Sequence, residues 1–243
     1  MKLAIAVPTY NEAANLKKLI PAIYRNLKSY PKLTCTLFIV DDNSPDGTAE
    51  VAEKLGLKYR TSSFHVKVLR RKTKEGLGKA YIYAFRHILN DKFDFILQMD
   101  ADLSHDPKYL PAFLDAAKRV DFVVGSRYIK NGGTPDWQWY RKLLSRGGNL
   151  YTRLFLGSQI TDYTGGYNLY STSLLKRIDL NNLHAGGYGF LIELKYRALH
   201  NCQAVEQVAI VFMDRQHGSS KIPRNIIFKN LVLVPQLAFK VKS

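Results

Sequence analysis

The sequence predicts an α/β fold in which short, largely parallel strands alternate with amphipathic helices. Five apolar runs of four to six residues, each bounded by turn residues, lie at 3–7, 35–40, 65–69, 95–99 and 121–124. Between them, apolar residues recur at helical spacing over 13–27, 80–88 and 110–117. Apolar strands separated by such helices are typical of a parallel sheet that is covered by helices on both faces.

The second half of the chain is expected to continue the same domain. Helical spacing over 137–156 and 190–199 and an extended run over 202–212 predict three further elements. No stretch has the composition of a linker, and no repeat with a period of roughly 20 to 50 residues is present. We therefore expect one domain over 1–222, followed by an amphipathic segment over 223–243.

Composition excludes several classes of protein and leaves an unusual charge. Hydrophobic residues make up 46% of the 243 residues and charged residues 23%, which excludes a disordered, collagen-like or disulfide-rich protein. The 36 Lys and Arg outnumber the 20 Asp and Glu, for a formal net charge of +16. This excess indicates a polyanionic partner: a nucleic acid, a phosphorylated substrate or an anionic membrane. Cys35 and Cys202 are too far apart in sequence for a metal-binding pair, so we expect neither zinc nor a disulfide, as in a reducing compartment.

The apolar segments are too short to cross a membrane. The first run ends at Pro8, before it reaches the length of a signal-peptide core. Near the C-terminus, Lys229 and Pro235 interrupt the run over 225–239. We expect the segment 223–243 to lie on an anionic membrane surface. The alternative is that it packs on the core of its own domain.

Three of the predicted strands end in acidic residues. Glu12 follows the first strand, Asp42 the second, and Asp100 and Asp102 the fourth. Ligands of parallel α/β sheets bind outside the carboxyl ends of the strands. Asp100 and Asp102 are about 6.5 Å apart along an extended chain, and such a pair can hold a divalent ion together with a diphosphate. The alternative is that aspartates simply suit turns and helix caps, which is our interpretation of Asp46.

Two common phosphate-binding motifs are excluded. The glycines at 76 and 78 begin a dinucleotide fingerprint, but Tyr81 stands where its third glycine would be. A P-loop would need other residues at Thr73 and Ala80. We expect residues 76–79 to begin a helix close to a ligand.

The order of the strand-end motifs resembles that of a known enzyme family. The motifs are Pro-Thr-Tyr-Asn-Glu at 8–12, Val-Asp-Asp-Asn-Ser-Pro-Asp-Gly-Thr at 40–48 and Asp-Ala-Asp-Leu-Ser-His at 100–105. In this order they resemble inverting nucleotide-sugar glycosyltransferases of GT-A fold. The resemblance narrows to the dolichyl- and polyprenyl-phosphate mannosyltransferases with Gly-Ser-Arg-Tyr at 125–128, Arg-Lys-Leu-Leu-Ser-Arg-Gly at 141–147 and Arg-Gln-His-Gly-Ser-Ser-Lys at 215–221. It covers residues 1–225, nearly the whole chain.

The resemblance implies a donor, an acceptor and a metal. Mannose would pass with inversion from GDP-mannose to a polyprenyl (dolichyl) phosphate, and Mg²⁺ or Mn²⁺ would neutralise the leaving GDP. The implied catalytic residues are Asp100, Asp102, Arg127 and Arg141, with Asp100 and Asp102 as metal ligands. The implied donor site consists of Pro8, Thr9, Tyr10, Glu12, Asp42, Asp100, Ala101, Asp102, Arg215 and Lys221. The implied acceptor-phosphate site consists of Arg127, Arg141 and Ser145.

A phosphate acceptor explains why the site needs no general base. The second pKa of a phosphate monoester is about 6, so the acceptor is already an anion at neutral pH. Arginines that position this anion therefore replace a carboxylate that would remove a proton. His105 and His217 are accordingly expected to be structural, hydrogen-bonded residues.

The resemblance also implies where the protein works. Because the polyprenyl chain is buried in lipid, we expect peripheral binding at the cytoplasmic face of a membrane, with or without a membrane-anchoring subunit. Trp137 and Trp139 belong either to the core or to this interface. Arg146 and Arg153 are expected on a solvated or membrane-facing side of their helix.

Two alternatives stay open at this point. The chain has Asn168 where the family usually has arginine, so a same-fold enzyme that transfers glucose or another sugar to polyprenyl phosphate or to a hydroxyl also fits. A nucleic-acid-binding module would explain the net charge. It is disfavoured because the chain shows no basic stripe interleaved with exposed aromatic residues, and because the strand ends are acidic.

Overall fold

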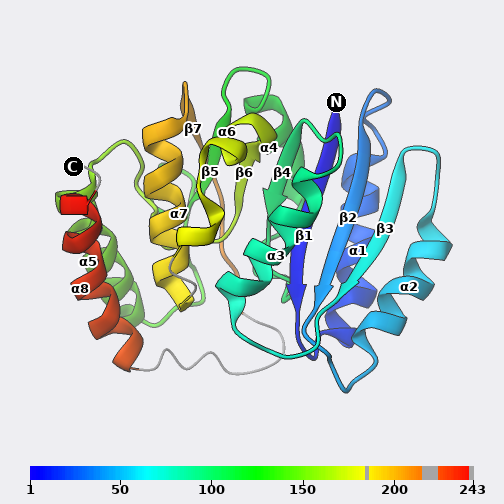
Figure 1. Cartoon of the computed structure of the whole chain (residues 1–243), viewed down its shortest axis with the longest axis horizontal. Coiled ribbons are helices and arrows are strands. Elements are labelled where there is room, and N and C mark those ends of the chain that lie inside the picture. The colour runs from blue at the N-terminus through cyan, green and yellow to red at the C-terminus, as the bar shows by residue number, and fades with distance from the viewer. Residues whose placement is uncertain (184–185, 215–223, 241–243) are drawn as a thin grey trace.

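In the computed structural model, residues 1–183, 186–214 and 224–240 are described, and their strands form one sheet. The strands are β1 (Lys2–Thr9), β2 (Thr34–Asp41), β3 (Phe64–Arg70), β4 (Phe95–Gln98), β5 (Phe122–Ser126), β6 (Asn168–Ser171) and β7 (Val205–Ala209). Their order across the sheet is β3-β2-β1-β4-β6-β5-β7 (Figure 1). Only β6 is antiparallel to its neighbours in this sheet, so the mostly parallel sheet predicted from the sequence is confirmed.

β6 is the strand that the sequence analysis missed. Its Leu169 pairs with Leu97 of β4 on one side and with Val123 of β5 on the other. The strand has four residues, too few for a recognisable alternation of polar and apolar side chains. Because β6 runs opposite to β4, its first residue, Asn168, pairs with Gln98 at the end of β4. The segment that leads into β6 is thereby brought to the carboxyl edge of the sheet.

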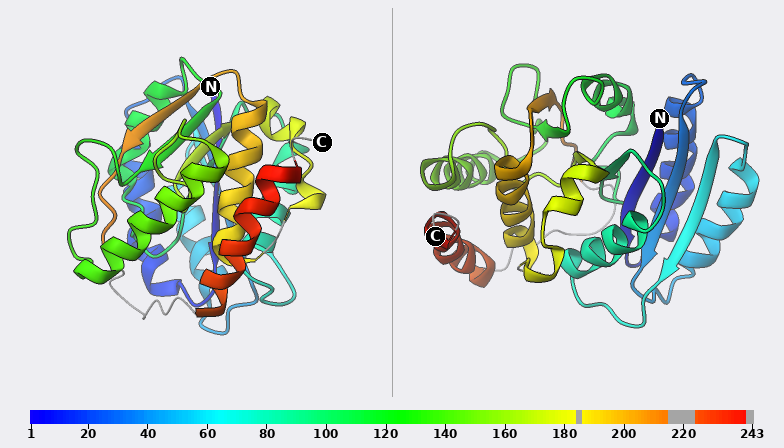
Figure 2. Two further views of the ribbon diagram at one scale, coloured as in Figure 1. Left: turned by 90° about the vertical axis from the view of Figure 1, so that its left-hand side faces the viewer. Right: turned by 45° about the horizontal axis from the view of Figure 1, so that its top comes forward.

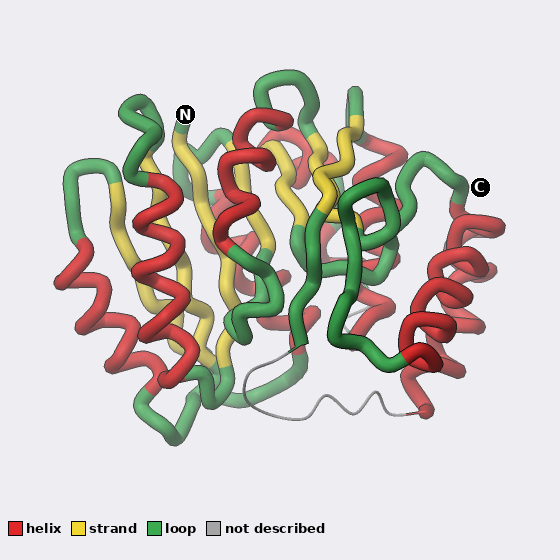
Figure 3. Tube along the Cα trace, turned by 180° about the vertical axis from the view of Figure 1, so that it is seen from behind, coloured by secondary structure: helices red, strands yellow, loops and turns green. Residues whose placement is uncertain are grey.

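Helices cover both faces of the sheet, as predicted (Figures 1 and 3). They are α1 (Ala13–Leu27), α2 (Thr48–Tyr59), α3 (Leu77–Leu89), α4 (Leu110–Ala116), α5 (Trp139–Leu156), α6 (Thr172–Arg177), α7 (Gly187–Asn201) and α8 (Arg224–Lys240), with short 3₁₀ turns at Pro107–Tyr109 and Leu180–Asn182. Leu3, Ile5 and Val7 of β1 pack in one buried cluster with α1, α2 and α4. Ala4 and Ala6 pack in the other with α3, α6 and α7. Burial on both faces explains why this strand is continuously apolar.

The C-terminal helix α8 packs on the domain rather than standing apart from it. Leu233, Val234 and Leu237 are buried in the same cluster as α3, α6 and α7. The Oη of Tyr151 on α5 donates a hydrogen bond of 2.8 Å to the carbonyl oxygen of Leu231. α5 and α8 lie side by side at one edge of the molecule (Figure 2). For the buried side of α8, the structure therefore shows the alternative given in the sequence analysis, in which residues 223–243 pack on the core of their own domain. Within the described ranges, no helix is both long and apolar enough to cross a membrane.

Candidate active site

A cleft of about 240 Å³ lies at the carboxyl ends of β1, β2 and β4. It is lined by all the predicted donor-site residues that are described: Pro8, Thr9, Tyr10, Glu12, Asp42, Asp100, Ala101 and Asp102. Arg215 and Lys221, the other two, lie outside the described residues, and so does His217. The cleft also includes Gly76 and Leu77, from the segment that the sequence predicts to lie near a ligand.

Lys74 is a lining residue that the sequence analysis missed. Its Nζ lies 3.8 Å from the centroid of the Tyr10 ring, close enough for a cation–π interaction. Lys74 therefore places a positive charge at the mouth of an otherwise acidic cleft. The basic run over 70–74, just before α3, is the sequence signal that could have identified it.

Three residues other than glycine adopt a positive φ at the ends of the strands that form the cleft. They are Asn11 (φ 61°), Asn43 (φ 59°) and Leu103 (φ 65°), which follow β1, β2 and β4. L residues rarely adopt this conformation, and each instance costs of the order of 1–3 kcal/mol. Backbone strain is thus concentrated at the edge where parallel α/β sheets bind their ligands.

Hydrogen bonds between loops hold this strained edge together. The backbone N–H of Asn11 donates to Oγ of Ser44 at 3.0 Å. Asp46 accepts from the hydroxyl of Thr48 (2.5 Å) and from the backbone N–H groups of Ala13 (3.1 Å) and Thr48 (3.0 Å), and these bonds lower its pKa against the effect of burial. The loops after β1 and β2 are therefore tied to each other, and the interpretation of Asp46 as a turn residue is confirmed.

Hydroxyl and backbone donors orient the two aspartates after β4. Asp102 is buried, and its Oδ1 accepts hydrogen bonds from the backbone N–H (3.1 Å) and the Oγ (2.5 Å) of Ser104. Asp100 is more open, with a quarter of its side chain exposed, and its Oδ1 accepts from Oη of Tyr81 at 3.1 Å. Neutral donors of this kind fix the direction of a carboxylate and leave its charge in place.

His105 supports the same turn as a neutral ring. Its Nδ1 accepts a hydrogen bond of 2.9 Å from the backbone N–H of Asp100. Burial lowers the pKa of His105, although the nearby aspartates act in the opposite direction. The ring stacks on Tyr167 at 4.9 Å and meets the edge of Phe212 at 5.6 Å. The predicted structural role of His105 is confirmed.

This carboxylate pair fits a divalent ion that takes most of its ligands from elsewhere. In the part of the chain that is described, no three His, Cys, Asp or Glu side chains are grouped so as to enclose a metal. Mg²⁺ and Mn²⁺ prefer oxygen ligands, and one or two carboxylates plus phosphate and water are a common set. Gly166 lies beside the pair: a Cβ there would be in ordinary van der Waals contact with the two carboxylate oxygens of Asp100, at 3.6 and 3.7 Å, and tight against the His105 ring, at 3.3 Å.

Asp42 enters the cleft as half of a buried ion pair. Its Oδ1 lies 2.5 Å from Nη1 of Arg71, and both side chains are less than a tenth exposed. Burial raises the pKa of Asp42, and the Arg71 guanidinium opposes that shift. Arg71 also donates to Glu75 at 2.8 Å. A ligand that reaches Asp42 would therefore meet a carboxylate whose position is already fixed.

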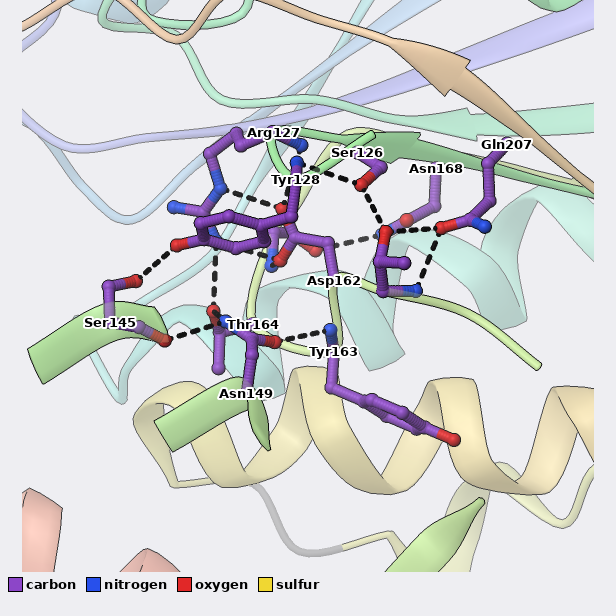
Figure 4. A network of polar contacts seen from close by, with 12 residues as sticks. Ser126, Arg127, Tyr128, Ser145, Asn149, Asp162, Tyr163, Thr164, Asn168 and Gln207 are labelled. Carbon is purple, nitrogen blue, oxygen red and sulfur yellow. Dashed lines mark hydrogen bonds and ion pairs between the residues drawn. The ribbon is translucent and has the colours of Figure 1, made fainter. Parts of the chain in front are cut away.

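A second polar network, centred on Arg127 and Asp162, contains two of the predicted acceptor residues (Figure 4). The Nε and Nη2 of Arg127 donate to the two carboxylate oxygens of Asp162 at 2.7 and 2.8 Å. Both residues are buried. Burial alone would raise the pKa of Asp162, but the guanidinium holds it far below its usual range. Nη2 of Arg127 also donates to Oγ1 of Thr164 at 2.8 Å. Ser145 shares a hydrogen bond of 2.6 Å with the hydroxyl of Tyr128.

Arg141, the third predicted acceptor residue, contacts the same indole ring as Arg127. Its guanidinium stacks 4.0 Å from the centroid of Trp137, and that of Arg127 lies 5.4 Å from the same ring. Nη1 of Arg141 donates to Asp214 at 2.8 Å in a partly exposed pair. Trp137 is buried whereas Trp139 is 75% exposed. The sequence alone left open whether either tryptophan belongs to the core, and the structure places Trp137 there and Trp139 at the surface.

The loop over 162–166 connects this network to the cleft. Asp162, which holds Arg127, also accepts from the backbone N–H of Gly165 at 2.9 Å. The next residue, Gly166, lies against the carboxylate of Asp100. Phe212 forms a second bridge, because it contacts both His105 and the guanidinium of Arg127. The structure thus brings the predicted donor and acceptor residues into adjoining sites.

Asn168, where the sequence departs from the family pattern, lies in the sheet interior. It is fully buried, and its Nδ2 donates to Oε1 of Gln98 and to the carbonyl oxygen of Gly165, both at 3.2 Å. Asn168 thus holds the 162–166 loop through its hydrogen bond to Gly165. It is not among the residues that line the cleft.

Lys195 is a second residue that the sequence analysis missed. It is completely buried in α7, and its Nζ donates a 2.6 Å hydrogen bond to the carbonyl oxygen of Asp162. Burial lowers the pKa of Lys195 to about 7; Asp162 raises it and Arg127 lowers it further. Glu193 and Arg197 stand two residues away on either side, so the sequence around Lys195 looks like that of an ordinary surface lysine and gives no signal of its burial.

Comparison with known proteins gives a consistent result. Residues 4–179 match the family described as "Glycosyl transferase family 2". The chain is 37% identical over 234 residues to "Undecaprenyl-phosphate mannosyltransferase" of Micrococcus luteus, covering 96% of this chain and 93% of that protein. It is 38% identical over 219 residues to "Polyprenol monophosphomannose synthase" of Mycolicibacterium smegmatis, covering 90% and 80%.

Solved structures share the fold at lower identity. Mannosyl-3-phosphoglycerate synthase from Rubrobacter xylanophilus matches with a TM-score of 0.64 at 20% identity, over 99% of this chain and 73% of that one. The mannosyltransferase PcManGT from Pyrobaculum calidifontis, solved with GDP-Man and Mn²⁺, matches with a TM-score of 0.60 at 18% identity, over 98% and 73%. These likenesses support the fold of the sheet and its helices.

Lys195 makes the stability of the protein depend on pH in a predictable direction. Lysine in the unfolded chain has a pKa of about 10.4, whereas burial lowers that of Lys195 to about 7 in the folded chain. Between these values the unfolded chain binds the extra proton, so the free energy of unfolding rises with pH. We expect the wild type to gain roughly 1–2 kcal/mol over Lys195→Met between about pH 7 and pH 9.

Urea denaturation at several pH values measures this difference. Lys58→Met, which removes an exposed lysine on α2, is the matched control and should show no such trend against wild type. A difference between wild type and Lys195→Met that stays flat over this range would mean that Lys195 keeps its proton in the folded protein.

Proposed function

The chain belongs to glycosyl transferase family 2, and on that premise we propose that it transfers mannose from GDP-mannose to a polyprenyl phosphate. The products are polyprenyl-phosphate mannose and GDP. The names of the two relatives support mannose as the sugar and a polyprenyl phosphate as the acceptor. The observation that carries the proposal is the adjacency of an acidic cleft to an arginine-containing network, joined by the 162–166 loop.

The donor is assigned to the cleft at the strand ends. Pro8, Thr9 and Tyr10 would wall the nucleoside, and Glu12 and the paired carboxylate of Asp42 would meet the base or ribose. Asp100 and Asp102 would hold Mg²⁺ or Mn²⁺, which supplies positive charge for the leaving diphosphate. Arg215 and Lys221 stay proposed donor contacts on sequence grounds alone.

The acceptor phosphate is assigned to Arg141, Arg127 and Ser145, with different tasks. The pair of Arg141 with Asp214 is partly exposed, and such pairs contribute only about 0–1 kcal/mol, so an incoming phosphate can replace Asp214. The guanidinium of Arg127 already binds Asp162, and it would add positive field and hold Trp137 beneath Arg141. Ser145 lies one helical turn after Arg141 and would donate its hydroxyl.

The chemistry then needs positioning more than proton transfer. A phosphate oxygen of the acceptor forms a bond to the anomeric carbon while the bond from that carbon to the GDP oxygen breaks. Attack from the side opposite the leaving group inverts the configuration. The acceptor is an anion before it binds, so no side chain has to remove a proton. The arginines would hold the attacking phosphate oxygen close to the anomeric carbon and opposite the leaving GDP. Such positioning lowers the barrier to the transfer step.

A panel of nucleotide sugars tests the function directly. GDP-mannose, GDP-glucose and UDP-glucose are each offered with a short-chain polyprenyl phosphate, and the lipid product is measured. We expect product from GDP-mannose at a kcat/KM at least about 100-fold above that of the others, the size of effect that unpaired polar groups in a site produce. Preference for a glucose donor would contradict the sugar assignment. Failure with every lipid phosphate, together with a salt-sensitive rise of the melting temperature on adding DNA, would favour the nucleic-acid alternative.

The metal assignment predicts that nucleotide and metal bind together. Because Asp100 and Asp102 supply just part of a coordination shell, we expect Mn²⁺ to bind at least ~10-fold more tightly in the presence of GDP, whose diphosphate adds further ligands. Asp100→Ala and Asp102→Ala should each lower turnover at least ~100-fold, since the ion supplies several kcal/mol of charge stabilisation. Isothermal titration with Mn²⁺, with and without GDP, measures the first effect. Full activity of either variant in excess EDTA would exclude these two residues as metal ligands.

A variant at Arg141 distinguishes effects on acceptor use from effects on donor binding. Arg141→Ala removes a charge-assisted contact worth ~1.5–3 kcal/mol, so kcat/KM for a soluble acceptor should fall about 10- to 100-fold. The affinity for GDP-mannose should stay within a few-fold of wild type. Lys142→Ala, at the next position of the same helix, is the control and should change neither quantity. If Arg141→Ala abolished donor binding while acceptor saturation stayed the same, Arg141 would belong to the donor site.

A further inference from the structure

Tyr81 presents a buried hydroxyl to Asp100, and the proposed chemistry gives this hydroxyl no task. The side chain lies on α3 and is completely buried, and Tyr81 is not among the residues that line the cleft. Its Oη lies 3.1 Å from Oδ1 of Asp100 and 2.9 Å from the carbonyl oxygen of Met99. An ionised carboxylate and a peptide carbonyl can only accept hydrogen bonds. Tyr81 is therefore the donor to both.

One hydroxyl proton cannot form two strong hydrogen bonds at the same time. A phenol has a single O–H, so it donates to one acceptor or divides its proton between two. The ordinary pKa of a phenol is about 10, and burial raises the pKa of Tyr81 further, so the proton stays on the phenol at neutral pH. The hydroxyl can turn from one acceptor to the other by rotation about its C–O bond alone.

The ring of Tyr81 is held in place by its packing. It stacks on Phe85 of the same helix, with ring centroids 5.8 Å apart. It also stacks on Phe190 of α7, with centroids 6.0 Å apart and ring planes inclined by 4°. Phe85 and Phe190 are themselves fully buried. Oη therefore stays beside Met99 and Asp100, and its hydrogen is the part that can move.

The two aspartates after β4 are held in different ways. Oδ1 of Asp102 accepts both the backbone N–H and the hydroxyl of Ser104. Oδ1 of Asp100 shares the hydroxyl of Tyr81 with the carbonyl of Met99. The torsion that turns an aspartate carboxylate is soft, so hydrogen bonds set the direction of the group. Asp100 is thus the member of the pair whose hydrogen bonding a ligand can alter.

We propose that Tyr81 is a positioning residue for Asp100, and that its hydroxyl turns from the carboxylate to the carbonyl oxygen of Met99 when Asp100 binds the metal–diphosphate complex. This inference rests on the proposed function for the presence of that complex. A carboxylate that shares its charge with a cation is a weaker acceptor, and the Met99 carbonyl then becomes the better one. With a second acceptor in reach, the buried hydroxyl stays paired in both states, whereas an unpaired one would oppose binding.

Tyr81→Phe keeps the ring and removes the hydroxyl, so it tests the positioning role directly. Loss of a partner that orients a metal ligand typically weakens metal binding about 10- to 100-fold. We expect Tyr81→Phe to bind Mn²⁺ at least about tenfold more weakly than the wild type in the presence of GDP, as measured by isothermal titration. Its affinity for GDP in EDTA should not change, because Tyr81 does not line the cleft.

Tyr170→Phe is the matched control for the loss of a buried hydroxyl. Tyr170 is also fully buried, and its Oη donates to Oε1 of Gln98 at 3.3 Å. Both variants should lower the melting temperature, since each loses a buried hydrogen bond. Tyr170→Phe should nevertheless bind Mn²⁺ in the presence of GDP as the wild type does. Equal weakening of Mn²⁺ binding in the two variants, or wild-type binding by Tyr81→Phe, would overturn the positioning role.

The change of acceptor has an infrared signature. The chain has three methionines, Met1, Met99 and Met213, so ¹³C labelling of methionine carbonyls marks three peptide groups. A peptide carbonyl absorbs at lower frequency when it accepts a stronger hydrogen bond. When Mn²⁺ and GDP are added, the band of Met99, identified by its loss in Met99→Leu, should move to lower frequency in the wild type and stay in place in Tyr81→Phe. The same movement in both, or none in the wild type, would exclude the change of acceptor.

These measurements use no sugar and no lipid, so their outcome is separate from that of the transfer reaction. Absence of lipid product with every nucleotide sugar, together with weakened Mn²⁺ binding in Tyr81→Phe, would contradict the proposed function and support the role of Tyr81. Product formation by the wild type with unchanged Mn²⁺ binding in Tyr81→Phe would do the reverse. Failure of the wild type to bind Mn²⁺ in the presence of GDP would overturn the metal assignment and the role of Tyr81 together.

Discussion

The buried ion pair of Arg127 and Asp162 fixes how the two halves of the site lie relative to each other. Asp162 begins the loop that runs past the carboxylate of Asp100 and into β6, and Arg127 follows directly after β5. Lys195 adds a hydrogen bond to the backbone of Asp162 from α7. Removal of one partner of such a buried pair typically costs about 3–5 kcal/mol, because the other charge is left uncompensated. We therefore interpret Arg127 as a positioning residue first, and as a source of positive potential for the acceptor second.

Two adjoining regions of different chemistry result from this arrangement. The carboxylates at the ends of β1, β2 and β4 create a negative cleft that suits a metal-bound diphosphate, with strained turns and interloop hydrogen bonds holding the lining in place. Next to it, Arg127 and Arg141 both lie over the Trp137 ring, and each is paired with an aspartate. α5 carries Arg141 and Ser145, two of the residues that we assign to the acceptor phosphate. The net charge of +16 fits an anionic acceptor of this kind.

Much of this could be predicted from the sequence, and the remainder depends on contacts between distant segments. The apolar runs at 3–7 and 35–40 identify buried strands because both faces of β1 and β2 are covered. The parallel order of these strands brings Glu12, Asp42 and Asp100 to one edge, so the cleft followed from the pattern. β6 was missed because its four residues take their pairing from β4 and β5. Lys195 and the Arg127–Asp162 pair were missed because a buried charge is recognised only by its partner, which lies more than 30 residues away.

We propose that one metal-bound diphosphate binds at the carboxyl end of β4, beside the loop over 162–166 to which Arg127 is bound. Crystals grown with GDP and Mn²⁺ test it most directly, because the anomalous signal of manganese locates the ion without reference to the protein. We expect a single strong peak within about 2.0–2.6 Å of a carboxylate oxygen of Asp100 or Asp102, the range of such metal–oxygen bonds, with the diphosphate next to it. A nucleotide bound in the cleft with manganese elsewhere, or a diphosphate held at Arg127 and Arg141 instead, would contradict it.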